Sequence, residues 1–164
     1  MSDINDETVD ARQQAEAVVP FLEDLLVAFD LEGTVRTEEI DDDTVEVLVE
    51  GDDLGLLIGP RGNTLRSVQE LSRTVVQRTH PGRLDGRVRV DVGGYRRRRT
   101  EALEAFTRKL AAEVASSGQQ KALEPMSAAD RKVVHDTVVE IDGVGTSSEG
   151  EEPTRRVVLI PADS

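Results

Sequence analysis

One short segment constrains this chain more than any other: Ile58-Gly59-Pro60-Arg61-Gly62-Asn63-Thr64 joins a short apolar stretch to a longer amphipathic one. Glycines at both ends of a four-residue turn let the backbone approach a ligand closely and adopt dihedral angles that other residues resist. Arg61 places a positive charge between them, and the first N–H groups of the following helix point toward the same space. The segment therefore predicts a helix, a Gly-x-x-Gly turn and a second helix that together could hold an extended sugar-phosphate backbone.

The net charge of −13 does not exclude an anionic ligand, because the charges are sorted along the chain. Residues 1–53 hold 18 acidic and 2 basic residues, whereas residues 60–109 hold 13 basic and 5 acidic ones. Interactions between exposed charges are screened beyond about 8 Å at physiological salt, so the local sign matters more than the total. The basic segment begins at the Gly-x-x-Gly turn and is a candidate for contacts with phosphate groups.

Apolar periodicity around the turn predicts six elements in the first half of the chain. In chain order they are a helix over residues 11–29, strands over 34–39 and 44–50, helices over 52–58 and 63–78, and a strand over 87–92. Pro20 interrupts the first helix, where we expect a kink or a restart. The order α-β-β-α-α-β, with the Gly-x-x-Gly turn between the last two helices, resembles the prokaryotic-type KH fold.

Gly93-Gly94 marks a boundary, beyond which the sequence predicts a second unit. Its expected elements are a long helix from residue 95 to about residue 116, a short strand over 120–123, a helix from 127 to about 139, and strands over 144–148 and 156–160. Gly118 is the expected cap of the long helix. The spacing of Ser127 and Asp130 is that of a capping box and predicts the start of the next helix.

Within the second unit, Arg131 and His135 are four residues apart on a predicted helix and therefore share one face. A phosphate could accept hydrogen bonds from both side chains. Alternatively, Arg131 pairs with a nearby carboxylate and His135 lies half-buried against the sheet. The spacing alone leaves both interpretations open.

Three further segments make the second unit recognisable: Leu-Glu-Pro-Met at residues 123–126, Asp-Arg-Lys-Val-Val-His at 130–135 and Thr-Ser-Ser-Glu-Gly-Glu-Glu-Pro at 146–153. They resemble the Arg-x-x-x-His (R-three-H) domain of the bacterial Jag family, whose members are also called SpoIIIJ-associated proteins or KhpB. Residues 58–65 resemble the KH domain of the same family. We therefore expect an α+β chain that consists of an acidic disordered tail (1–10), a KH domain (11–94) and an Arg-x-x-x-His domain (95–164) with helices packed on a three-stranded sheet.

The resemblance also implies a function: a cytoplasmic protein that binds single-stranded RNA, with single-stranded DNA as a further candidate. Family members act as post-transcriptional regulators or RNA chaperones linked to cell elongation and division, often beside a small single-KH protein. Many carry an extra N-terminal domain; here only an acidic segment precedes Ala11, so no role of that domain is carried over. The residues carried over as nucleic-acid contacts are Gly59, Pro60, Arg61, Gly62, Asn63, Arg66, Arg131 and His135, with Arg96, Arg97, Arg98 and Arg99 as candidate phosphate contacts.

Enzymatic classes find no support in the sequence. The absence of cysteine excludes disulfides, thiolate chemistry and thiolate zinc sites. The two histidines, His80 and His135, lie in unrelated contexts, and residues 55–60 do not fit the Walker phosphate-binding template. We expect no catalytic residue, cofactor or metal. The sequence contains no run of 18 apolar residues, so it predicts no membrane-spanning helix.

Apolar and aromatic residues limit the mode of binding that we expect. Ile58, Leu65 and Val68 are candidates for an apolar wall beneath the bases, and equally for the core. The three phenylalanines (Phe21, Phe29, Phe106) are expected on core faces, so stacking of bases on aromatic rings should contribute little. The alternative to nucleic-acid binding is a protein-interaction adaptor that uses a KH-like scaffold without contacting RNA.

Overall fold

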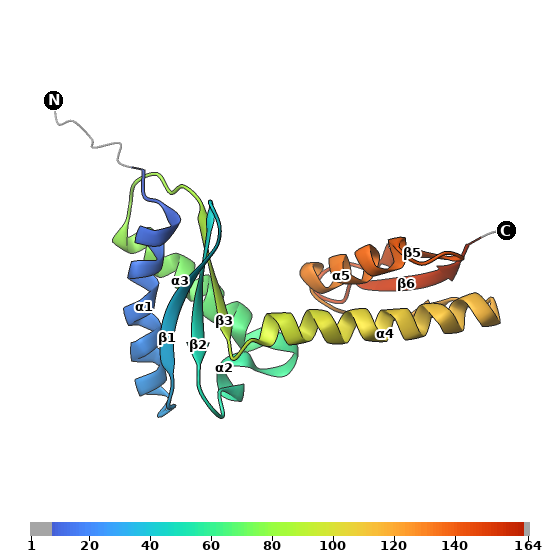
Figure 1. Cartoon of the computed structure of the whole chain (residues 1–164), viewed down its shortest axis with the longest axis horizontal. Helices are drawn as coiled ribbons and strands as arrows, with labels where there is room; N and C mark the ends of the chain where they lie inside the picture. Colours follow the sequence, from blue (N-terminus) through green and yellow to red (C-terminus); the bar gives the residue numbers. More distant parts are fainter. Residues whose placement is uncertain (1–7, 163–164) are drawn as a thin grey trace. The chain divides into compact units, whose positions relative to one another are not determined.

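A computed structural model describes residues 8–162, which form two compact units that divide between Arg96 and Arg97 (Figure 1). Each unit combines helices with one three-stranded sheet, so the expected α+β fold class is confirmed. The division lies two residues beyond the boundary expected after Gly94. The reason is that Tyr95 packs against the core of the first unit and Arg96 hydrogen-bonds to its last strand.

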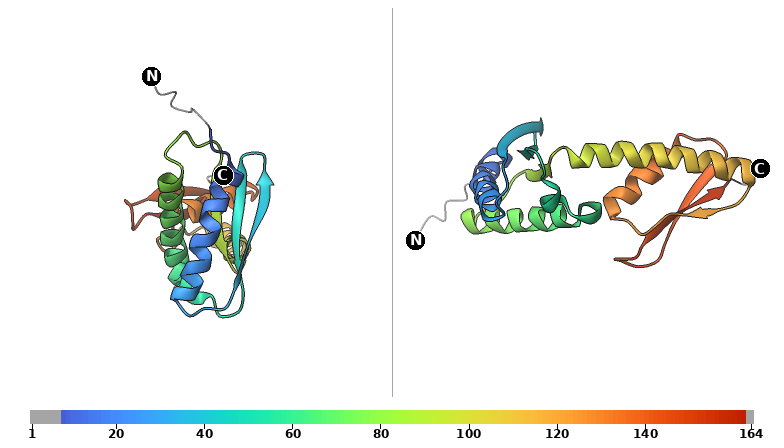
Figure 2. Two further views of the ribbon diagram at one scale, coloured as in Figure 1. Left: turned by 90° about the vertical axis from the view of Figure 1, so that its left-hand side faces the viewer. Right: turned by 90° about the horizontal axis from the view of Figure 1, so that it is seen from below.

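The first unit contains the helices and strands expected from the sequence, with one additional 3₁₀ turn. They are α1 (Ala11–Ala28), β1 (Thr34–Asp41), β2 (Thr44–Glu50), α2 (Gly55–Ile58), η1 (Pro60–Gly62), α3 (Asn63–Thr79) and β3 (Arg87–Val92). The sheet has the order β1-β2-β3, in which β1 and β2 are antiparallel and β2 and β3 are parallel. The left view of Figure 2 shows α1 and α3 side by side against this sheet.

The core of the first unit lies between the sheet and these two helices. The valines of β2 and β3 face each other in register: Val45 with Val88, Val47 with Val90 and Val49 with Val92. Their β-branched side chains suit a pleated surface. From the helices, the buried apolar residues lie along one face: Val18, Leu22 and Leu26 in α1, and Leu65, Val68 and Val76 in α3, where the buried Ser72 lies between the last two. This packing fixes α3 and therefore the Gly-x-x-Gly turn that precedes it.

The start of α1 corrects one expectation from the sequence. Residues 1–7 of the predicted disordered tail lie outside the described residues, but the tail does not extend to residue 10. Val9 is buried and forms a parallel bridge with Leu84. Asp10 caps α1 reciprocally with Gln13: the Gln13 N–H donates to Asp10 Oδ1 at 2.9 Å, and the Asp10 N–H donates to Gln13 Oε1 at 3.0 Å. These contacts order the chain from Val9 onward.

Pro20 lies inside α1, which runs as one helix without the restart that the sequence allowed. Proline removes the hydrogen bond to the carbonyl group four residues earlier, here that of Glu16. Both Pro20 and Glu16 are exposed, so water can satisfy that carbonyl group.

The second unit contains α4 (Tyr95–Ser117, of which the first two residues belong to the first unit), β4 (Lys121–Ala122), α5 (Ala128–Val139), β5 (Val144–Glu149) and β6 (Arg156–Pro161). Its sheet has the order β4-β6-β5 and is antiparallel throughout. The expected caps are present: Gly118 follows α4 with φ 67°, and the Asp130 N–H donates to Ser127 Oγ at 3.2 Å. Among the described residues, no helix is long and apolar enough to cross a membrane.

Two phenylalanines that the sequence placed in the core are exposed, which corrects that expectation. Phe29 is 47% exposed because α1 ends at Ala28 and its buried stripe ends at Leu26. Phe106 is 52% exposed because the buried stripe of α4 runs through the neighbouring Thr107. Two of the three phenylalanines therefore present aromatic surface to solvent, where we expected all three on core faces.

Candidate nucleic-acid interface

The Gly-x-x-Gly turn depends on two glycines that no other residue can replace without a shift. Gly59 has φ 69° and ψ 176°, and a Cβ at this position would lie 2.2 Å from Thr64 Oγ1. Gly62 has φ 73°, and a Cβ there would lie 2.7 Å from Cε1 of Tyr95. Both positive φ values disfavour L-residues even without the clash. The turn is therefore tightly packed on both sides.

Between these glycines, Arg61 adopts a left-handed conformation with φ 56° and ψ 24°. A non-glycine residue in this region stores strain, and such positions cluster at functional sites. The side chains of Pro60 and Arg61 are both exposed. The turn thus presents a cation from a backbone that the two glycines hold.

The helix that follows continues this surface. Asn63 begins α3, and none of the described side chains caps its N-terminus, where Gly62 stands as the N-cap residue. The Asn63 N–H donates to the Pro60 carbonyl of the preceding 3₁₀ turn, so it is the N–H groups after it, together with the positive end of the helix dipole, that favour an anion. Arg66 lies one turn further along the same face as Asn63; both are exposed, and Arg66 forms no ion pair among the described residues. The turn and the first turn of α3 therefore form one electropositive surface.

The sequence left open whether the apolar residues near the turn line a wall beneath the bases or belong to the core. Leu65 and Val68 are buried in the core, and Ile58 is half-buried against it, so the core interpretation holds for the first two. Sequence reasoning missed Leu56, which is 58% exposed in α2. The signal was present in the spacing: Leu54, the N-cap residue of α2, and Leu57 within the helix are buried, which leaves Leu56 outward.

The run Arg96–Arg99 does not act as a single basic stripe. The Arg96 N–H donates to Asp91 Oδ1 at 3.2 Å, and its Nε donates to the Val90 carbonyl at 3.0 Å. Burial lowers the pKa of the Arg96 guanidinium and raises the pKa of the Asp91 carboxyl, because both ionised groups lose hydration. Arg96 therefore anchors the start of α4.

The other three arginines of the run belong to the second unit. Arg99 Nη2 lies 3.1 Å from Asp130 Oδ2, which ties α4 to α5. Arg97 is largely exposed, with Glu101 3.9 Å away, and Arg98 is exposed. A phosphate contact must be exposed to solvent. Of the four arginines in this run, only Arg97 and Arg98 meet that requirement.

The Arg131–His135 pair has partners within the second unit. Arg131 is buried; its Nη1 donates to the Met126 carbonyl at 2.8 Å, and its Nη2 pairs with the Glu152 carboxylate. His135 is half-buried on the same helix and lies against β5. These contacts match the alternative left open by the spacing, in which Arg131 pairs with a carboxylate and His135 lies half-buried against the sheet.

The ring of His135 is held between two hydroxyl groups of β5. Its Nδ1 is 2.6 Å from Thr146 Oγ1, and its Nε2 is 2.8 Å from Ser148 Oγ. A hydroxyl group can donate or accept, so it can pair with either state of a ring nitrogen. The two side chains of the motif therefore share a face but have separate partners.

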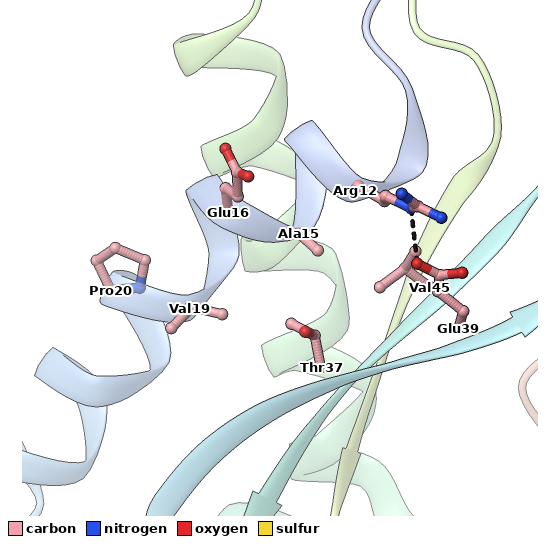
Figure 3. Close-up of a pocket in the computed structure, with 8 residues that line it drawn as sticks. All are labelled: Arg12, Ala15, Glu16, Val19, Pro20, Thr37, Glu39 and Val45. Atoms are coloured by element: carbon pink, nitrogen blue, oxygen red, sulfur yellow. Dashed lines mark ion pairs between the residues drawn. The ribbon is translucent and has the colours of Figure 1, made fainter.

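A groove of about 660 Å³ lies between α1 and the first two strands, and none of the predicted site residues lines it (Figure 3). Its floor is apolar, and the Nε of Arg12 lies 2.6 Å from Oε1 of Glu39 at its rim. Glu16 and Glu39 outnumber the one arginine, so the groove does not favour a phosphate ligand. In the described part of the chain, no group of three or more histidine or acidic residues could hold a metal ion.

Comparison with known proteins agrees with this geometry. The family model for the KH domain of KhpA and KhpB matches residues 16–92, and the model for the R-three-H domain matches residues 101–161. The chain is similar to proteins named RNA-binding protein KhpB. The protein from Clostridium symbiosum is 34% identical over 145 residues (88% of this chain and 64% of the relative), and that from Bacillus subtilis is 33% identical over 155 residues (93% and 72%).

The relatives differ in length. The chain spans 64% of the length of the Clostridium symbiosum protein. It spans 45% of the length of the RNA-binding protein KhpB from Streptococcus pneumoniae, and the two are 28% identical over 150 residues. The Bacillus subtilis relative is covered over more than two thirds of its length. With a matching KH domain, a matching R-three-H domain and this coverage, the expected resemblance is confirmed: the chain belongs to the KhpB (Jag) family.

Proposed function

We propose that this chain binds single-stranded RNA through the Gly-x-x-Gly turn of its KH domain. The observation that carries the proposal is the turn itself: two glycines in contact with their neighbours hold Arg61 in a left-handed conformation at the uncapped start of α3. A backbone so arranged can clamp an extended strand of about four nucleotides. The KhpB relatives, which are named RNA-binding proteins, support the same conclusion.

Each part of this surface has a distinct task in the proposal. The N–H groups that follow Asn63 in the first turn of α3 donate to phosphate oxygens, and Arg61 and Arg66 neutralise phosphate charge. The side-chain amide of Asn63 can donate and accept at a base edge. Leu56 offers an apolar surface on which a base can rest. Without an aromatic platform in this set, we expect modest affinity and weak sequence preference.

The R-three-H domain supplies a second proposed contact. A phosphate would replace the Glu152 carboxylate at Arg131, because both anions accept from a guanidinium in the same way. His135, Arg97 and Arg98 would extend this surface. In the cell, we propose a cytoplasmic post-transcriptional regulator or RNA chaperone, linked to cell elongation and division, with a small single-KH protein as partner.

The direct test replaces Pro60 and Arg61 together by aspartate. This change puts two negative charges where phosphate should lie and leaves both glycines in place. Measured by fluorescence polarisation on a short single-stranded RNA, affinity should fall at least about tenfold, which is about 1.4 kcal/mol. The circular-dichroism spectrum should not change, because both side chains are exposed.

The matched control is Gln77→Asp with Arg78→Asp, which makes the same change of charge at an exposed pair in the last turn of α3. It should leave affinity within about twofold, since screening limits the reach of each charge to about 8 Å. Wild-type affinity should also fall with salt, with a log–log slope of about −2 to −3 for three or four phosphate contacts. A folded double-aspartate variant that binds as tightly as wild type would contradict the proposal, and a wild-type protein that shows no salt-sensitive binding to RNA would favour the adaptor.

A further inference from the structure

Tyr95, the first residue of α4, lies directly against the Gly-x-x-Gly turn. A Cβ built on Gly62 would lie 2.7 Å from Cε1 of the tyrosine ring, 3.2 Å from Cζ and 3.3 Å from the hydroxyl oxygen. The ring is half-buried and also packs against the core of the first unit. One edge of Tyr95 therefore covers the second glycine of the turn, while the rest of the side chain is fixed by the core.

The residues around Tyr95 are anchored to the sheet. Before it, the Gly93 N–H donates to the Val49 carbonyl at 2.8 Å, and Gly93 and Gly94 turn the chain with φ values of 58° and 70°. After it, Arg96 donates to both Asp91 and Val90. Because the chain is held on both sides of Tyr95 and its ring packs against the core, the tyrosine has little freedom to leave its position.

We propose that Tyr95 is a positioning residue for the RNA-binding turn. By filling the space beside Gly62, the ring keeps that residue in its left-handed conformation and so holds the strained backbone of Arg61 and the first N–H groups of α3 in place. A site that is ordered before binding loses less conformational entropy when the ligand arrives. The inference rests on the proposed function, because it concerns the same turn.

The first test compares Tyr95→Ala with Tyr95→Phe by fluorescence polarisation on single-stranded RNA. Alanine removes the ring and should weaken binding on the order of five- to tenfold, whereas phenylalanine keeps the packing and should bind within about twofold of wild type. Because Tyr95 also contacts the core, Tyr95→Leu is the second variant: it keeps apolar bulk but not the flat edge against Gly62. It should fold and still bind several-fold more weakly than Tyr95→Phe.

A double-mutant cycle separates positioning from a direct base contact or a general loss of stability. In a chain that already carries Pro60→Asp and Arg61→Asp, Tyr95→Ala should weaken binding by less than twofold, because the turn through which it acts no longer binds. If the same factor were lost in both backgrounds, Tyr95 would act independently of the turn and the inference would be overturned.

Hydrogen exchange gives a reading that does not depend on RNA. In Tyr95→Leu, amide exchange should accelerate over residues 61–65, while the amides of β2 and β3 keep their wild-type rates. Uniform acceleration, or none at the turn, would overturn the inference. If Tyr95→Leu binds like wild type while the double-aspartate variant does not, positioning fails and the proposed function stands. If neither variant affects RNA binding, the proposed function fails.

Discussion

The two domains present their candidate contacts in opposite ways. In the KH domain, backbone geometry forms the site: two glycines shape the turn, and α3 begins without a side-chain cap. In the R-three-H domain, side chains form it, and both Arg131 and His135 already have polar partners. A backbone site is thus complete before RNA arrives, whereas a side-chain site must exchange partners to bind. The KH turn should therefore contribute more to affinity.

The largest effect is expected from Gly59→Ala. The new Cβ would meet Thr64 Oγ1 at 2.2 Å, in a conformation with φ 69° and ψ 176° that only glycine adopts easily. Strain of this kind costs about 1–3 kcal/mol, and displacement of Thr64 adds to it. Chemical unfolding should show a loss of about 3 kcal/mol, and RNA affinity should fall more than tenfold.

Gly118→Ala is the matched control for this change. Gly118 also has a positive φ of 67°, but nothing lies within 4 Å of a Cβ built there. Its loss should be limited to the left-handed strain, about 1 kcal/mol, with RNA affinity of the folded protein unchanged. If the two substitutions had equal effects on stability and RNA affinity, the close contacts around Gly59 would not distinguish the KH turn from any other left-handed glycine.

The second effect tests whether the R-three-H pair is one site or two structural contacts. Arg131→Ala removes the hydrogen bond to Met126 and the pair with Glu152, and His135→Ala removes two contacts with hydroxyl groups. Each should lower stability by about 1–2 kcal/mol. Because the partners are separate, these losses in thermal unfolding should add within about 0.5 kcal/mol.

RNA affinity of the same variants provides the discriminating comparison. If both side chains bind one phosphate, each single change weakens binding severalfold, and the double variant loses less than the product of the two factors. If affinity stays flat while stability falls, the pair is structural and the KH turn alone binds RNA. The control is Lys132→Ala, a neighbouring exposed cation whose Nζ pairs with Asp136 at 2.5 Å; such a surface pair contributes about 0–1 kcal/mol.

What the sequence could predict follows the same contrast. Element order, the caps at Gly118 and Ser127 and the KH turn were readable because each depends on local backbone rules. The role of Arg99 was not, since its partner Asp130 lies 31 residues further along the chain and only tertiary structure brings it near. The role of Arg96 was not either, since its Nε donates to the Val90 carbonyl across the Gly93-Gly94 turn, a contact that spacing does not reveal. Spacing also leaves the task of a side chain open: Arg131 and His135 show the same i, i+4 pattern whether they bind phosphate or Glu152 and β5.

The smallest effect, and the sharpest test of partner exchange, is Glu152→Gln. Glu152 is 59% exposed, and glutamine keeps a hydrogen-bond acceptor for the Arg131 guanidinium, so thermal unfolding should change by less than about 1 kcal/mol. If a phosphate must displace this carboxylate, removing its charge should raise RNA affinity about two- to fivefold. The gain should vanish in Arg131→Ala, where no guanidinium is left to compete for. Glu151→Gln, an exposed neighbour in the same turn, is the control for net charge. An equal gain from both substitutions would mean that only the overall charge matters, whereas a gain confined to Glu152→Gln would identify Arg131 as a phosphate contact despite its partners within the domain.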